Sequence, residues 1–296
     1  MCRGRKRGTL DGMSKDVGLF GPDSVTWKLH QEPILMMGGL RSLYLQALHP
    51  RAVAGVAQNS GYRDDPWGRL IRTSDYVGTV IYGSTDEVHR AASRVRRLHA
   101  GMTAVDPGTG ERFRIDEPDL LRWVHVAEVE SFLTTGVRAG VRLTPEEVDG
   151  YYTEQLRSAE LVGLDPSTVP STAAEVEAYF AAMRPELELT RDGAEAALFL
   201  TVPPVPDHWG GLALRLGLTL GPARWAYLGV ASTAIGLLPA WARKIYGGLG
   251  WPTTDLAAGL SVRGLRALIA AVLATLPQQY QVAPIRRAAL ERAGLA

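Results

Sequence analysis

The chain has 296 residues, of which 46% are hydrophobic and 21% charged, and its formal net charge is +1. A chain of this length and apolar content can bury a large core without disulfides or metal sites. Because a nucleic-acid binder is expected to be strongly basic, the near-neutral charge excludes a nucleic-acid partner.

The chain begins with the basic run MCRGRKRG, which contains the only cysteine, Cys2. One cysteine cannot form an internal disulfide, and this favours a reducing, cytoplasmic location. No apolar stretch follows the basic run, so neither a Sec nor a twin-arginine export signal is complete. We expect residues 1–18 to be a flexible basic segment and residues 19–296 to form one all-α domain.

Helical periodicity dominates the next part of the chain. Capping signals begin three predicted helices, at Ser84, at Thr144 and at Ser171–Thr172, and acidic residues follow each of them. Apolar residues recur at three- and four-residue spacings in SLYLQALHPRAVAGVAQNS, DEVHRAASRVRRLHAGM, EPDLLRWVHVAEVESFLTTGVRAG and TPEEVDGYYTEQLRSAELVG. Alternating, strand-like segments are few and short, so the pattern predicts an all-α fold.

Two segments interrupt the predicted helices. Residues 101–116, GMTAVDPGTGERFRID, carry a Pro-Gly-Thr-Gly turn between short runs, which predicts a hairpin or an irregular loop. Residues 201–211, TVPPVPDHWGG, contain three prolines and cannot be helical. We interpret them as a connector between an N-terminal helical body and a C-terminal apolar helical hairpin.

The most apolar runs lie in the C-terminal part, at residues 226–240 and 256–276. Pro239 interrupts the first run, and Arg263 and Arg266 interrupt the second. Neither run therefore offers the roughly 20 uninterrupted apolar residues that cross a bilayer. We expect buried helices with a membrane-facing patch at most, and no transmembrane segment.

The sequence lacks the common hydrolytic and nucleotide-binding motifs. It has no G-x-S-x-G elbow, no Walker loop, no G-x-G-x-x-G after a strand and no H-E-x-x-H. With Cys2 as the only thiol, cysteine-ligated zinc and iron–sulfur sites are excluded. A metal site would therefore use histidine or carboxylate ligands, and the six histidines are His30, His49, His89, His99, His125 and His208.

His99 and His125 are the main candidates for a metal ligand. Each follows apolar or small residues by one turn of an amphipathic helix, so each imidazole is expected to point inward. A neutral imidazole binds iron well, and one helical histidine facing an apolar cavity holds haem in globins and peroxidases. On the residues alone, a buried structural histidine remains the more common explanation, and we favour it for His30 and His49. His89 is expected on a solvated face.

Arginines concentrate in the same region. Arg69 and Arg72 flank one turn beside Thr73, and three further arginines, Arg96 among them, precede His99. Haem propionates, or another carboxylate or phosphate, would be natural counter-charges for such a cluster. Ordinary surface ion pairs are the alternative, and the residues alone favour it; the acidic residues in reach are Asp64, Asp65, Asp75, Asp86 and Glu87.

Two long segments, LFGPDSVTWKLHQEP through GSTDEV and RVRRLHAGM through WVHVAEVESFL, resemble a known family. It is the bacterial and fungal family of MpaB-type oxygenases and latex clearing proteins, which are rubber oxygenases. The resemblance extends from about Leu19 to about Tyr246 and is densest from Pro33 to Phe132. It implies a globin-like helical core with additional N- and C-terminal helices, b-type haem held by one histidine, and cleavage of polyisoprene double bonds with dioxygen.

The resemblance also implies site residues. The family's axial histidine, in an R-V-R-x-x-H-A segment, falls on His99, and a distal-side motif falls on Arg69, Arg72 and Thr73. Ser131 corresponds to a small hydroxyl residue near the cofactor. Rubber oxygenases carry lysine where Arg72 stands, and a guanidinium that stays charged is a poor iron ligand. We therefore expect Arg72 to stabilise an anion or bound oxygen rather than to coordinate iron.

Together these features predict a cytoplasmic haem b oxygenase that acts with dioxygen on a hydrophobic small molecule, such as an isoprenoid or a lipid. An electron donor is a further partner that such a reaction could use. His99 is the expected metal ligand, His125 lies beside the cofactor or replaces His99 as ligand, and Arg96 is a cofactor-binding candidate. Glu128, one turn after His125, is the candidate acid or base, with a solvated carboxylate as the alternative.

Two further alternatives share the same fold. One is a non-catalytic haem or lipid carrier, in which the C-terminal apolar helices form the binding cavity. The other is a family member that has lost haem and keeps its histidines as structural residues.

Overall fold

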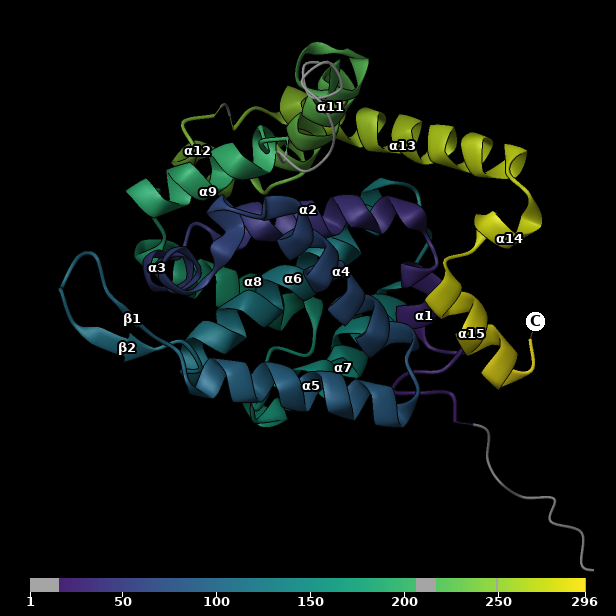
Figure 1. The fold of residues 1–296 in the computed structure, drawn as a ribbon, viewed down its shortest axis with the longest axis horizontal. Helices are drawn as coiled ribbons and strands as arrows, with labels where there is room; N and C mark the ends of the chain where they lie inside the picture. The colour runs from purple at the N-terminus through teal and green to yellow at the C-terminus, as the bar shows by residue number, and fades with distance from the viewer. Residues whose placement is uncertain (1–15, 206–216, 249, 296) are drawn as a thin grey trace, which may run out of the picture.

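The computed structural model describes residues 16–205, 217–248 and 250–295. Within these ranges helices make up nearly all of the regular structure, and the sheet consists of two short strands (Figure 1). The predicted all-α fold is confirmed. Most of the basic N-terminal segment, residues 1–15, lies outside the described residues.

The N-terminal body contains the helices that surround the candidate site. They are α1 (Val25–His30), η1 (Pro33–Leu35), α2 (Met36–Gln46), α3 (Pro50–Asn59), η2 (Gly61–Arg63), α4 (Pro66–Tyr82), α5 (Thr85–Ala100), α6 (Pro118–Arg138) and α7 (Pro145–Val162). The helices that follow are η3 (Pro166–Thr168), α8 (Ala173–Met183), η4 (Arg184–Glu186), α9 (Arg191–Thr201), α11 (Pro222–Gly236), α12 (Ala240–Ile245), α13 (Pro252–Thr275), α14 (Gln278–Gln281) and α15 (Pro284–Ala293).

Local capping fixes where several of these helices begin. Ser84 and Thr144 each form a capping box, in which the hydroxyl accepts from the backbone N–H three residues on and a glutamate accepts from the cap residue's own N–H. At α8 the cap is Thr172, and the neighbouring Ser171 donates its N–H to Glu175 at 2.7 Å. A cap of this kind contributes about 1 kcal/mol to helix stability.

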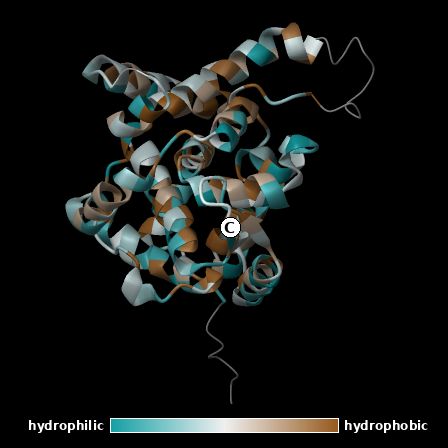
Figure 2. Cartoon of the chain, turned by 90° about the vertical axis from the view of Figure 1, so that its left-hand side faces the viewer, coloured by the Kyte–Doolittle hydropathy of each residue, from teal (hydrophilic) through white to brown (hydrophobic). Residues whose placement is uncertain are grey.

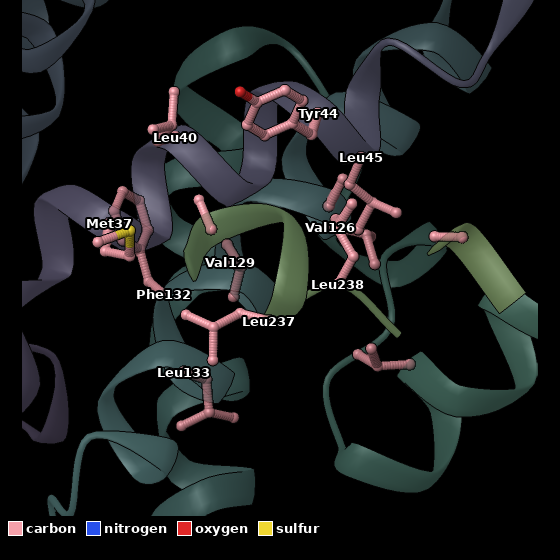
Figure 3. Packing of buried hydrophobic residues seen from close by; sticks show 14 of the residues in the cluster. Met37, Leu40, Tyr44, Leu45, Val126, Val129, Phe132, Leu133, Leu237 and Leu238 are labelled. Atoms are coloured by element: carbon pink, nitrogen blue, oxygen red, sulfur yellow. The ribbon is translucent and has the colours of Figure 1, made fainter. Parts of the chain in front are cut away.

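The core centres on the crossing of α2 and α6. One buried cluster joins the two helices (Figure 3). It contains Met37, Leu40, Tyr44 and Leu45 of α2, Val126, Val129, Phe132 and Leu133 of α6, and Leu237 and Leu238, which follow α11. Gly38 allows the close approach, because a Cβ there would lie 3.1 Å from the Phe132 Cα. This crossing fixes α6, which carries two of the candidate site residues.

The predicted hairpin between α5 and α6 is confirmed. Strands β1 (Thr103–Val105) and β2 (Arg112–Arg114) are antiparallel, with Ala104 opposite Phe113. Those two side chains point inward, onto Leu120 of α6 and Ala54 of α3. The hairpin thus connects the end of α5, where His99 lies, to the start of α6.

The C-terminal part differs from the sequence-based prediction. Helices α11 and α13 lie at one edge of the molecule, and apolar residues continue along the peripheral helices (Figures 1 and 2). We expected buried helices, but only 11% of the most apolar window of α13 is buried. By length and composition α13 could also cross a membrane. The prediction of burial is wrong for α13, because hydropathy does not indicate whether another element covers a helix.

Candidate active site

One face of α4 carries two polar residues of the candidate site. Arg69 and Tyr76 lie within about 20° of each other around the helix axis. The helix begins at an Asp65 cap, whose carboxylate accepts from the Gly68 N–H, with Pro66 in the first turn. Arg69 is half-buried and donates to the Ser60 Oγ at 2.7 Å, and it forms no ion pair with any residue in the described ranges. Burial lowers the pKa of Arg69, and the charge of the neighbouring Arg72 adds to that effect.

His99 lies at the end of α5, on the face that also carries the buried Val88 and Ala92. The imidazole is half-buried and forms no hydrogen bond to any described residue. Desolvation lowers its pKa; Asp116 acts in the opposite direction, and the charge of Arg69 lowers the pKa further. The net shift favours the neutral imidazole, which is the form that ligates a metal. The fold also brings it close to Arg69.

His125 and Glu128 share one face of α6. Desolvation lowers the pKa of His125 to about 4 and raises the pKa of Glu128 to about 7. Both side chains still keep some exposed surface, and neither is hydrogen-bonded to another described residue. The Glu128 charge adds to desolvation in raising the pKa of Tyr76 on α4. Glu128 therefore lies near enough to Tyr76 for its charge to act there, and it is desolvated, unlike a freely solvated carboxylate.

An apolar cavity adjoins Arg69. It has a volume of about 80 Å³ and is lined by α2, α3, α4, α6 and α9. Arg69 and Tyr62 contribute polar groups to a wall that is otherwise mostly aliphatic and aromatic; the apolar lining includes Leu43, Val53, Val56, Leu70, Phe199 and Leu200. A larger surface hollow of about 540 Å³, beside η3 and α8, contains none of the predicted site residues.

The helices that carry these residues fall within one family match. Residues 27–272 match the model described as ER-bound oxygenase mpaB/B'/Rubber oxygenase, catalytic domain. The chain belongs to this oxygenase family. Membership confirms the predicted family and places the chain among oxidoreductases. Neither the curated proteins nor the solved structures contain a significant match.

A further pair of polar residues in the oxygenase was not predicted. His30 of α1 lies 3.1 Å from the Tyr151 hydroxyl of α7, measured from Nε2, and packs edge-on against Phe132. Burial lowers the pKa of His30 to about 3. Burial and the charge of Glu128 both raise the pKa of Tyr151. His30 is thus a partly buried histidine with a structural partner, but that partner is a tyrosine 121 positions away, and no local pattern indicates that pairing.

The other histidines of the oxygenase lie away from this group or outside the described residues. His49 is buried and caps α3, where its Nδ1 accepts from the Ala52 N–H, so the prediction of a core histidine bonded to backbone is confirmed. His89 is exposed, as predicted. His208 lies outside the described residues.

Three of the predicted site residues do not point into the candidate site. Arg72 and Thr73 are exposed, and Arg96 is bonded to another helix. The Arg72 side chain is 68% exposed and pairs with Asp65 at 3.2 Å, which is the surface ion pair considered as the alternative. Thr73 is exposed and donates to the Arg69 carbonyl at 3.0 Å. Arg96 donates to the Leu161 carbonyl at the end of α7, although its charge still reaches Tyr76.

Ser131 belongs to a buried ion pair on the α2 side of α6. Its hydroxyl accepts from Arg41 at 2.6 Å, and Arg41 also pairs with Glu130 at 2.6 Å. Arg41 donates a further hydrogen bond to the Leu237 carbonyl at 2.9 Å. The Ser131 hydroxyl is thus engaged by Arg41 rather than by His125 or Glu128. Glu130, the other glutamate of this turn, is used to neutralise Arg41.

Proposed function

We propose that this oxygenase depends on haem b and uses dioxygen to oxidise a hydrophobic small molecule of the isoprenoid or lipid type. Family membership supports the oxygenase class. One observation supports haem: His99 is a desolvated, neutral imidazole with no hydrogen-bond partner in the described part of the chain, and the guanidinium of Arg69 lies near it.

The candidate site offers single imidazoles as metal ligands rather than a set of side chains that could hold a metal ion by themselves. In the described ranges, no group of three or more His, Cys, Asp or Glu side chains is placed to hold a metal ion. Haem iron already has four porphyrin nitrogens and needs only one further protein ligand. His99 can supply that ligand, with His125 as the alternative.

Arg69 is suited to the anionic part of such a cofactor. Its guanidinium is half-buried and lacks a carboxylate partner among the described residues. A desolvated guanidinium binds carboxylates through short, charge-assisted hydrogen bonds, and its charge acts more strongly there than in water. We assign this role to Arg69 rather than to Arg96, because Arg96 already donates to the end of α7.

When bound, haem supplies the activation of dioxygen. The chain supplies the surroundings. The apolar cavity beside Arg69, of about 80 Å³, offers an apolar wall to a few carbon atoms of the substrate. Glu128, with a pKa near 7, can hold a proton or accept one at its carboxyl group. Tyr76 and Tyr151, whose pKa values the Glu128 charge raises, remain protonated beside it.

The stoichiometry decides whether an electron donor is needed. If both atoms of dioxygen enter one carbon–carbon double bond, that bond breaks, two carbonyl groups form, and no external electrons are required. If one oxygen atom enters the substrate and the other becomes water, two electrons and two protons must come from a donor. We propose the first reaction, because a substrate of isoprenoid type offers such double bonds.

Reconstitution with haemin tests the proposal. The full chain is first titrated with haemin. Oxygen uptake is then followed with an acyclic isoprenoid hydrocarbon in detergent, in the presence and in the absence of an added reductant. We expect saturable haemin binding and oxygen uptake that matches the carbonyl groups formed. Binding without oxygen uptake would contradict the oxygenase and favour a carrier, and absence of binding would contradict the dependence on haem.

A further inference from the structure

The C-terminal helices expose an unusual amount of apolar surface. Six Leu, Trp and Tyr side chains between α11 and α14 are exposed by more than half of their area: Trp225, Trp251, Leu256, Leu260, Leu268 and Tyr280. No described residue covers them. Soluble monomers rarely expose contiguous apolar patches of this kind unless the patch contacts a membrane or a partner. These six residues are called the C-terminal apolar surface below.

Helix α13 is fixed to the body through its opposite face. Ala258 and Val262 are buried there, and a Cβ added to Gly236 of α11 would lie 2.9 Å from the Ala258 Cβ, so the two helices pack closely. Arg266 pairs with Glu32 at 2.6 Å. The inward face therefore anchors α13 along the surface of the molecule (Figure 1). A helix held in this way presents its leucines outward and does not leave the body to cross a bilayer.

The charge of this part of the chain is strongly positive. Residues 217–295 contain eight Lys and Arg but only two acidic residues, Asp255 and Glu291, which gives a net charge of +6. The whole chain carries +1. Because like charges repel across an interface, two copies of this part of the chain are poorly suited to face each other. An anionic surface is the complementary partner.

We propose that the C-terminal apolar surface docks the protein onto the face of an anionic lipid bilayer, with α13 lying in the plane of the interface. Leu256, Leu260 and Leu268 enter the boundary between headgroups and acyl chains. Trp225, Trp251 and Tyr280 suit the same depth, because their rings combine an apolar body with a polar group. The exposed Lys and Arg residues of this part of the chain, such as Lys244 and Arg263, bind the anionic headgroups. Docking would also place the enzyme where hydrophobic molecules concentrate.

Vesicle flotation of the full chain tests this docking. Vesicles of phosphatidylcholine are compared with vesicles that contain about 30% phosphatidylglycerol. We expect at least about tenfold stronger partitioning onto the anionic vesicles, and a loss of that preference in about 0.5 M salt. Equal partitioning onto both kinds of vesicle, or no partitioning at all, would overturn the proposal.

A matched pair of variants locates the surface. The double variant L260S/L268S should lower partitioning onto anionic vesicles at least about tenfold, because two inserted leucines are lost. Leu198→Ser removes an equally exposed leucine from α9 (60% exposed, as is Leu260) and should change partitioning less than about twofold. Circular dichroism checks that both variants fold. An equal loss in Leu198→Ser would overturn the assignment. The assignment would also be overturned if light scattering without vesicles showed that the wild type is a dimer and that L260S/L268S is a monomer.

Discussion

The guanidinium of Arg69, on α4, lies close enough to His99, on α5, that its charge lowers the pKa of the imidazole. Desolvation is the larger cause, and Asp116 opposes both effects. The two residues are 30 positions apart in the sequence and come near each other because α4 and α5 pack side by side. This proximity places the residue proposed to bind an anion near the residue proposed to bind iron.

Substitution of Arg69 should therefore change His99 directly. In Arg69→Ala a positive charge is removed, so the pKa of His99 should rise, as followed by NMR titration of the imidazole resonances. The same variant should bind haemin at least about tenfold more weakly, because a charge-assisted pair is lost.

Arg72→Ala is the matched control, because it removes an arginine one turn away on the same helix. Its ion pair with Asp65 is exposed, so the free energy of unfolding should change by less than about 1 kcal/mol. Haemin affinity should stay within about twofold of wild type. The proposed role of Arg69 would be contradicted if the His99 pKa were unchanged in Arg69→Ala. It would also be contradicted if the two variants, Arg69→Ala and Arg72→Ala, lost equal haemin affinity relative to wild type.

Glu128 should make stability depend on pH in a characteristic direction. Burial raises its pKa to about 7 from an ordinary value of 4.5, so folding favours the protonated carboxyl. The free energy of unfolding should therefore fall as the pH rises from about 4.5 to about 7, by at most about 3 kcal/mol. Partial exposure of the side chain reduces this figure.

Glu128→Gln removes the titration while keeping the shape of the side chain. Denaturant unfolding should show the variant to be more stable than wild type at pH 8, by about 1–3 kcal/mol, and equal to it at pH 4. If the proton at Glu128 is used in turnover, the variant should also lose the dependence of kcat on pH near 7. A variant less stable than wild type at pH 8 would contradict the desolvated carboxyl.

The Arg41 ion pair should prove structural. Glu130→Ala leaves a guanidinium that is 1% exposed without its counter-charge, and should lower the free energy of unfolding by about 3–5 kcal/mol. Ser131→Ala removes one hydrogen bond from the same guanidinium and should cost about 1–3 kcal/mol. In denaturant unfolding the two losses should rank in that order.

Ser131→Ala also tests the resemblance-based expectation that this hydroxyl lies near a cofactor. Since its hydrogen bond is to Arg41, folded Ser131→Ala should bind as much haemin per molecule as wild type. Reduced haemin binding by a normally stable variant would restore a cofactor role.

The sequence predicted those features that local signals determine. Ser84 and Thr144 begin helices because the capping hydroxyl and its glutamate are three residues apart, and the turn around Gly110 produces the hairpin. The shared face of His125 and Glu128 follows from helical geometry alone.

Features that depend on distant residues could not be predicted in this way. Ser131 is bonded to Arg41, which is 90 positions away, and helical periodicity does not indicate which arginine meets which hydroxyl. Arg69 and Arg72 resemble each other in sequence, yet one faces the interior and the other pairs with Asp65 at the surface. The exposure of α13 depends on what covers it, which its composition does not indicate.

The central claim is that His99 binds the iron of haem b. Haemin-reconstituted wild type, His99→Ala and His125→Ala are compared by absorption spectroscopy and the pyridine haemochrome assay, with circular dichroism to check helical content. We predict about one haem per chain in wild type and in His125→Ala, and loss of the Soret band in His99→Ala with helical content unchanged. Colourless wild-type protein, or a Soret band that survives in His99→Ala but not in His125→Ala, would contradict the claim.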